Sequence, residues 1–198
     1  MGRMTIWTFV LCFAIIMAAV ACTESDPDFP DQVNTFLSEE EILWLEHLGL
    51  TLHKGSDPPN IQGSYLLDTL AVYYDDLGRD FDLASYTYHF TDQIGDSINV
   101  SFSSPGANDE ATNLQGYISG SGDCFNVFLN VLGTRPQCNY NMPQIISGCL
   151  SASGIIDWRW GLIMGEKAGS GCDGMLVDGH RRILEEADTL AARVSNSK

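Results

Sequence analysis

The chain has 198 residues, with 26 acidic and 10 basic side chains and a formal net charge of −16 at pH 7. A surface this acidic offers no basic face to displace counterions from nucleic acid or to attract anionic lipid headgroups. The composition therefore excludes nucleic acid as a partner and excludes membrane binding through a basic patch.

The N-terminal segment has the features of a secretory signal peptide. Arg3 is the single charged side chain before Cys22, residues 5–20 are apolar, and small residues come directly before Cys22. A weakly basic start, a short apolar core and a small-residue cleavage site are typical of signal peptides, and the apolar run is short for a membrane span. We therefore expect residues 1–21 to be removed on export.

The cleavage site, Ala-Val-Ala-Cys22, resembles the lipobox of bacterial lipoproteins, although Ala19 stands where that motif more often carries Leu. Plain secretion after cleavage by ordinary signal peptidase is the alternative. Cys12 leaves with the signal, so acylation of Cys22 leaves an even set of thiols, which suits disulfides outside the inner membrane: Cys124, Cys138, Cys149 and Cys172. The resemblance implies a lipid anchor at Cys22 and a location in the cell envelope, with the outer membrane and its surface as the expected site.

A tether and a short helix are predicted next. Residues 22–36 are acidic and punctuated by proline, so they should form a flexible spacer. Ser38 and Glu41 make a capping box, and Leu37 and Ile42 can form the hydrophobic staple that accompanies one. The helix should end at Gly49.

From Ile61 onward the apolar pattern has a period of two, which predicts strands. These strands cover residues 86–90, 98–103, 124–131 and 157–164, with others near 62–69, 114–120 and 143–150, and turn signals separate them. Residues 183–194 fit either a helical face or a last strand. Short strands at about ten-residue spacing indicate an all-β sandwich or barrel, and residues 37–198 suffice for one such domain.

The chain carries Pro-Pro-Asn-Ile-Gln-Gly-Ser-Tyr at residues 58–65, Tyr-Ile-Ser-Gly-Ser-Gly at 117–122 and Ile-Ser-Gly at 146–148. In these segments it resembles a group of small uncharacterised lipoproteins of Bacteroidota. The resemblance implies a single antiparallel up-and-down barrel of the lipocalin-like, or calycin-like, kind, with a short N-terminal helix. Lipocalins proper have Gly-x-Trp near the first strand, where this chain has Gly63-Ser64-Tyr65.

The strand pattern also predicts the disulfides. If strands 124–131 and 143–150 form a hairpin around residues 133–139, Cys124 lies directly opposite Cys149, where β-carbons approach closely enough for a bridge after a small adjustment. Cys138 and Cys172 then pair by elimination. The alternative is that some thiols stay reduced and pack as small apolar groups.

No sequence motif for catalysis or metal binding is present. The chain lacks a nucleophile elbow, a His-Glu-x-x-His motif, a phosphate loop and a Cys-x-x-Cys motif, and its four histidines show no ligand spacing: His47, His53, His89 and His180. The acidic run 75–82 invites a calcium interpretation, but Arg79 places a positive charge inside it, which favours an ordinary loop. We therefore expect no enzyme activity, no metal and no cofactor.

The strand aromatics are the residues that can either fill a barrel or line a ligand pocket within it. The candidates are Tyr65, Tyr86, Tyr88, Phe90, Phe102, Phe125, Trp158 and Trp160. The sequence thus predicts a membrane-anchored envelope lipoprotein whose barrel binds a small apolar or amphipathic ligand. The alternative is an accessory or structural subunit of an envelope protein complex, without a small-molecule ligand.

Overall fold

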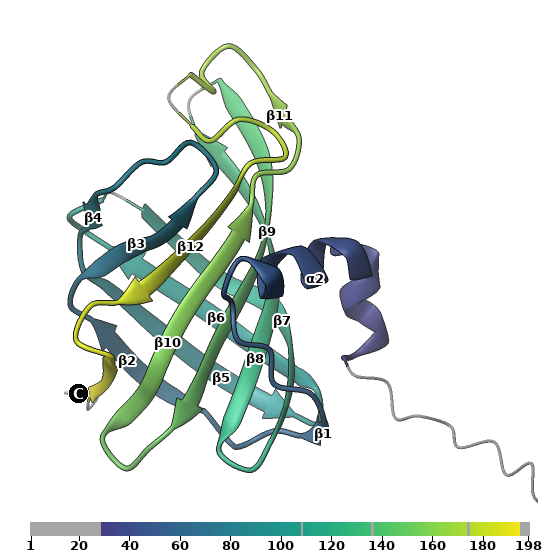
Figure 1. The fold of residues 1–198 in the computed structure, drawn as a ribbon, viewed down its shortest axis with the longest axis vertical. Coiled ribbons are helices and arrows are strands. Elements are labelled where there is room, and N and C mark those ends of the chain that lie inside the picture. The colour runs from purple at the N-terminus through teal and green to yellow at the C-terminus, as the bar shows by residue number, and fades with distance from the viewer. Residues whose placement is uncertain (1–28, 108, 136, 174, 195–198) are drawn as a thin grey trace, which may run out of the picture.

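A computed structural model describes residues 29–107, 109–135, 137–173 and 175–194 (Figure 1). The predicted signal peptide and the predicted lipid attachment site at Cys22 lie outside the described residues. The elements are η1 (Asp31–Thr35), α2 (Glu39–His47), β1 (Ser56–Asp57), β2 (Gly63–Leu67), β3 (Leu70–Asp75), β4 (Asp82–Leu83), β5 (Tyr86–Ile94), β6 (Ser97–Ser104), β7 (Asp109–Ser121), β8 (Cys124–Arg135), β9 (Cys138–Leu150), β10 (Gly154–Ile163), β11 (Lys167–Ala168), β12 (Arg181–Glu186) and β13 (Leu190–Val194).

The strands form a closed antiparallel barrel, which confirms the predicted mainly-β class and the antiparallel barrel. Neighbouring strands run in the order β9, β8, β7, β6, β5, β2, β13 and β10, and β10 pairs with β9 to close a ring of eight. Closure leaves no exposed edge in the ring, which is how up-and-down barrels avoid edge-to-edge association. The upper end of the barrel, at the top of Figure 1, carries the β8–β9 turn and β11, and the lower end carries the β7–β8 and β9–β10 turns.

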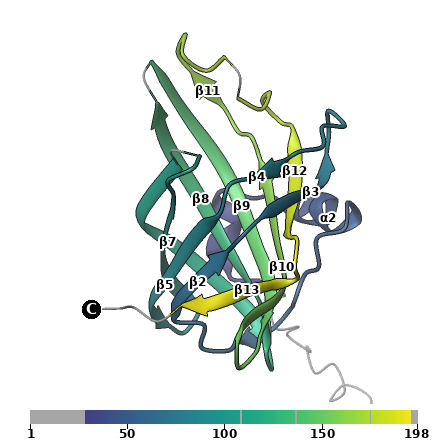
Figure 2. The same ribbon diagram turned by 90° about the vertical axis from the view of Figure 1, so that its left-hand side faces the viewer.

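One edge of β10 pairs with β9, and its other edge is shared by two strands. Its first residues, Gly154 to Ile156, pair with β13, whereas Arg159 to Ile163 pair with β12. Strand β12 pairs in turn with β3, and β3 pairs with β4, so at the upper end β3 lies between β12 and β4 while β2 pairs with β5 below (Figure 2). The wall of the barrel is therefore built differently at its two ends.

The ambiguous C-terminal segment is extended. Residues 181–186 and 190–194 form β12 and β13, and Thr189, which has a positive φ of 66°, lies in the turn between them. The helical interpretation of residues 183–194 is thus wrong, because both edges of this segment have strand partners that complete the barrel.

A second layer covers the outside of the barrel. Ser38 caps α2, its hydroxyl accepts from the Glu41 amide, and the Glu41 carboxylate accepts from the Ser38 amide. Apolar residues of the N-terminal segment pack with outward-facing strand residues into a small core: Val33, Leu37, Ile42, Leu45, Leu50, Phe128, Ile145, Ile163 and Ile183. Phe128 faces outward from β8 and is fully buried by this second layer.

The predicted tether is shorter than residues 22–36. Residues 31–35 form η1, Val33 is fully buried, and the rings of Phe29 and Phe128 lie edge to face at 5.2 Å between centroids. These apolar side chains gain burial against the barrel that the acidic composition of the segment conceals.

Candidate functional site

The upper end of the barrel contains a cavity of about 280 Å³. Its floor consists of inward-facing residues of β9, β10 and β12, among them Met142, Trp160 and Leu184, and its rim includes Arg79, Arg182 and Asp109. An apolar floor with a few polar groups at the mouth is typical of small-molecule sites, which often lie at the mouths of barrels.

The predicted pocket aromatics divide into two groups. Tyr86 and Trp160 line this cavity, and Trp160 also donates its indole N–H to Gln144 Oε1 at 3.0 Å. The other six do not line it and are at most 4% exposed: Tyr65, Tyr88, Phe90, Phe102, Phe125 and Trp158. These six side chains pack in the interior and do not line this cavity, although Trp158 also borders a cleft on the outer side of the barrel.

The aromatic filling is continuous through the middle of the barrel. The ring of Tyr88 lies 5.1 Å from that of Trp158 and 6.2 Å from that of Phe90, centroid to centroid. The ring of Tyr65 lies 5.9 Å from that of Phe90. Aromatic pairs at these separations add to the free energy gained by burial alone, so these rings contribute to the stability of the barrel.

Charged residues organise the rim of the cavity. The fully buried carboxylate of Asp75 binds Arg182 at 2.7 Å and Arg79 at 3.3 Å, and it also accepts from the Leu77 amide at 2.8 Å. Burial of Asp75 raises the pKa of its carboxyl, but the hydrogen bonds from Arg79 and Arg182 outweigh burial and lower this pKa to about 2.

The first two carboxylates of the acidic run 75–82 form hydrogen bonds and ion pairs with neighbouring residues. Asp75 holds both arginines, while Asp76 accepts from the Tyr74 hydroxyl at 2.8 Å and from the Arg181 amide at 2.8 Å. These partners, rather than a cation, satisfy the two carboxylates, which favours the ordinary-loop interpretation of this run. Arg182 also lies 4.7 Å from the centre of the Phe81 ring.

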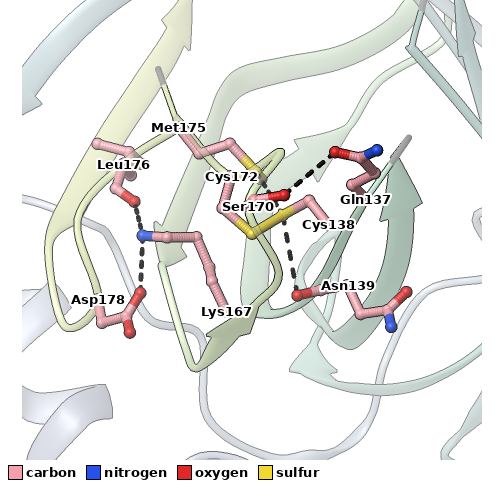
Figure 3. Close-up of a disulfide and its surroundings, with 9 residues drawn as sticks. All are labelled: Gln137, Cys138, Asn139, Lys167, Ser170, Cys172, Met175, Leu176 and Asp178. Carbon is pink, nitrogen blue, oxygen red and sulfur yellow. Dashed lines mark hydrogen bonds and ion pairs between the residues drawn. A yellow bond between two sulfur atoms is a disulfide. The ribbon is translucent and has the colours of Figure 1, made fainter.

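A disulfide fastens a loop at the upper end of the barrel (Figure 3). Cys172 is bonded to Cys138 at the start of β9, and Met175 lies 3.6 Å from the Cys138 sulfur. Met175 and Leu176 both line the cavity. This loop therefore places two apolar side chains over the mouth of the barrel.

An ion pair and hydrogen bonds also hold this loop (Figure 3). Lys167 Nζ lies 2.7 Å from the Asp178 carboxylate and also donates to the Leu176 carbonyl. The hydrogen bond from Lys167 lowers the pKa of Asp178. Ser170 donates to Gln137 Oε1 at 3.1 Å, which ties the loop to the β8–β9 turn.

The other disulfide lies at the lower end. Cys124 and Cys149 are paired directly across β8 and β9 and are bonded, so the structure joins the two pairs that the hairpin register and elimination predict. The strands continue to Arg135 and Cys138, which makes the turn tighter than the expected loop 133–139.

A second cleft, of about 320 Å³, runs along the outer surface beside this disulfide. His53, Cys149, Asp157, Arg159 and Glu186 are among its lining residues. Burial lowers the pKa of His53, an effect that the nearby carboxylate of Asp157 opposes, and burial raises the pKa of Glu186. No sequence motif marks this cluster, because its members come from four separate segments.

Three of the four histidines lack a common site. His89 shares a hydrogen bond of 2.8 Å with the Ser64 hydroxyl, His47 is on α2, and His180 follows the disulfide loop. His53 differs, since it lies beside two sulfur atoms.

The chain was compared with protein-family models, with curated proteins and with solved structures, and nothing matched in any of the three. Within the described ranges, no helix combines the length and apolar character needed to cross a membrane.

Proposed function

We propose that this protein is a lipid-anchored envelope protein that binds a small apolar or amphipathic molecule in the upper end of a lipocalin-like barrel. The observation that carries the proposal is the cavity of about 280 Å³ above the aromatic core. An apolar cavity of about 150 Å³ holds benzene, so a cavity of this size admits a ligand of roughly a dozen non-hydrogen atoms.

The lining of the cavity indicates how such a ligand lies. Met142, Trp160 and Leu184 offer apolar surface, while the guanidinium groups of Arg79 and Arg182 stand at the rim. An amphipathic molecule buries its chain against the first group and keeps its polar end near the second. Methionine suits this lining because its unbranched, polarizable side chain adapts to ligands of different shape.

Calorimetric titration with octan-1-ol, octanoate and octylamine tests the proposal. At least one of these probes should bind with 1:1 stoichiometry and a negative heat-capacity change, the signature of apolar burial. Met142→Trp should abolish this binding, because Met142 is only partly buried and a larger side chain there fills the cavity. Leu132→Trp is the matched control, since Leu132 is on the same hairpin and is 74% exposed. The absence of binding by all three probes would contradict the proposal.

The anchor requires its own experiment. Cys22→Ser removes the only sulfur that the lipobox can present for acylation, so the protein should move from the membrane fraction to the soluble fraction and lose its acyl mass. A Cys22→Ser protein that still carries acyl mass would contradict the anchor.

The alternative, an accessory subunit of an envelope complex, is supported by the exposed face of α2. Leu43 and Trp44 are 53% and 40% exposed on this helix, and Arg181 stacks over the Trp44 ring at 4.1 Å. Exposed apolar side chains of this kind are common in protein interfaces. A Leu43→Glu variant that leaves a copurifying envelope protein unchanged would weigh against this alternative.

A further inference from the structure

We propose that Cys124, Cys149 and His53 form a redox-gated zinc site, in which reduction of the disulfide frees two thiolates that bind Zn²⁺ together with the imidazole. This site is distinct from the barrel cavity and does not depend on the proposed ligand-binding function. The two sulfur atoms and a ring nitrogen of His53 all lie within 4.8 Å of one another. Two thiolates and an imidazole are donors that zinc prefers in proteins.

The backbone keeps the two sulfurs close after reduction. Cys124 and Cys149 are directly opposite each other on paired strands, with a Cα–Cα distance of 3.9 Å. A tetrahedral ion with Zn–S bonds of about 2.3 Å needs sulfur atoms about 3.8 Å apart. Rotation of the two side chains meets this requirement, so β8 and β9 need not separate.

Buried polar side chains fix the position of His53. Asn126, which is fully buried, accepts from the His53 amide at 3.1 Å and donates to the His53 carbonyl at 2.6 Å. Ser119, also fully buried, donates to the same carbonyl at 3.1 Å. The segment that carries His53 is therefore held against the outer face of β7 and β8, and the imidazole is kept beside the disulfide in advance of metal binding.

A distortion in β10 places a carboxylate in the same cleft as the imidazole. The pairing of β10 with β9 shifts register between Ile156 and Arg159, and Asp157 within this bulge has a φ of 54°. Such left-handed backbone is costly for a residue other than glycine, and bulges commonly redirect side chains near functional sites. Here Asp157 and His53 line the same cleft. In many metal sites a carboxylate that does not bind the metal lies close to the metal-binding histidine and orients its ring.

The chemistry balances with a thiol reductant. Two equivalents of a thiol R–SH attack in sequence through a mixed disulfide, which yields Cys124–SH, Cys149–SH and one R–S–S–R. Binding of Zn²⁺ to the two thiols and the neutral imidazole then releases two protons. The adjoining cleft of about 320 Å³ leaves room for water as the fourth ligand.

Cobalt titration tests the proposal. The purified protein is reduced with a phosphine, freed of reductant and titrated anaerobically with Co²⁺. We expect a sulfur-to-cobalt charge-transfer band and tetrahedral d–d bands that saturate at one equivalent, disappear on addition of Zn²⁺ and are absent from the oxidised protein. Cys138→Ser/Cys172→Ser should retain the bands, and Cys124→Ser should lose them.

Two further variants separate ligand roles from folding. His53→Gln leaves the disulfide able to form, so it should fold, yet it should weaken cobalt binding more than Asp157→Asn, for which we expect a loss of about 10–100-fold. His89→Gln is the matched control and should bind as the unmodified protein does. The proposal is overturned if the reduced protein gives no bands, if Cys124→Ser or His53→Gln binds equally well, or if reduction abolishes the native circular dichroism spectrum.

Discussion

Aromatic side chains pack differently at the two ends of the barrel. In the lower and middle part, rings such as those of Tyr88, Phe90 and Trp158 lie within about 6 Å of one another and are buried. At the upper end, Tyr86 and Trp160 face a cavity of about 280 Å³. Aromatic side chains of the same two strands, β5 and β10, thus either pack in the core or line the cavity, depending on their position along the barrel axis.

The disulfides and charges follow the same division. One disulfide fixes the strands of the filled end, and the other fastens the loop that walls the hollow end. At the hollow end the buried carboxylate of Asp75 has two arginine partners. Towards the filled end, Glu186 has one carboxylate oxygen without a hydrogen-bond partner among the described residues. The two ends of one barrel thus differ in what their disulfides hold and in how their buried carboxylates are paired.

The largest expected effect comes from emptying the filled part. Trp158→Ala should lower the free energy of unfolding by about 3–5 kcal/mol, because the remaining core cannot collapse around the lost ring. Met142→Ala, in the floor of the cavity, should cost about 1 kcal/mol or less, since a partly exposed site relaxes more easily. Urea unfolding measures both. Equal losses in the two variants would contradict the division into core and cavity.

Removing each disulfide sharpens the comparison further. The bridges close loops of 25 and 34 residues, so chain entropy predicts a loss of about 3.5 kcal/mol for Cys124→Ser/Cys149→Ser and of about the same for Cys138→Ser/Cys172→Ser. Only the second pair should also weaken binding of the octan-1-ol probe, because it frees Met175 and Leu176. Equal effects of the two changes on probe affinity would show that the loop is not part of the site.

The carboxylate at the hollow end should stabilise the fold above its ordinary pKa. Because the pKa of Asp75 is about 2 when folded and about 3.8 when unfolded, its contribution of about 2 kcal/mol is complete above pH 4 and is lost as pH falls through 2. Asp75→Asn should therefore destabilise the protein at pH 7, and the difference from wild type should shrink towards pH 2. Asp80→Asn, an exposed change in the same loop, should have little effect at any pH.

The smallest effect should have the opposite sign and arise at Glu186. Burial raises the pKa of this carboxyl above its unfolded value. The contribution of Glu186 to stability is therefore greatest below about pH 4.5 and declines as pH rises through the folded pKa. Glu186→Gln should raise the urea midpoint at pH 7 and converge with wild type at pH 4, because Gln stays neutral and can still accept from the Thr69 amide. A lower midpoint at pH 7 would show that the charge is stabilised by a partner.

Most of the β framework follows from local pattern. The alternation in Tyr86-Thr87-Tyr88-His89-Phe90 predicts a strand with one buried face, and β5 is that strand. The pairing of Cys124 with Cys149 follows as well, because opposed residues in a hairpin have a constant sum of residue numbers and a tight turn fixes that sum. These features depend on neighbours along the chain or across a single hairpin.

The sequence could not separate core aromatics from lining aromatics, nor place His53 beside a disulfide. Trp158 and Trp160 share a face and differ by two residues, and each has two aromatic neighbours on β5, yet only Trp160 lines the cavity at the upper end, because much of the rest of that lining comes from β9, β12 and the disulfide loop. His53 reaches its position through buried Asn126 and Ser119 on two other strands. By itself the sequence determined the strands that alternate clearly, such as β5 and β6. Closure of the barrel decided that residues 181–194 are extended and which side chains meet, since those contacts join segments that are distant along the chain.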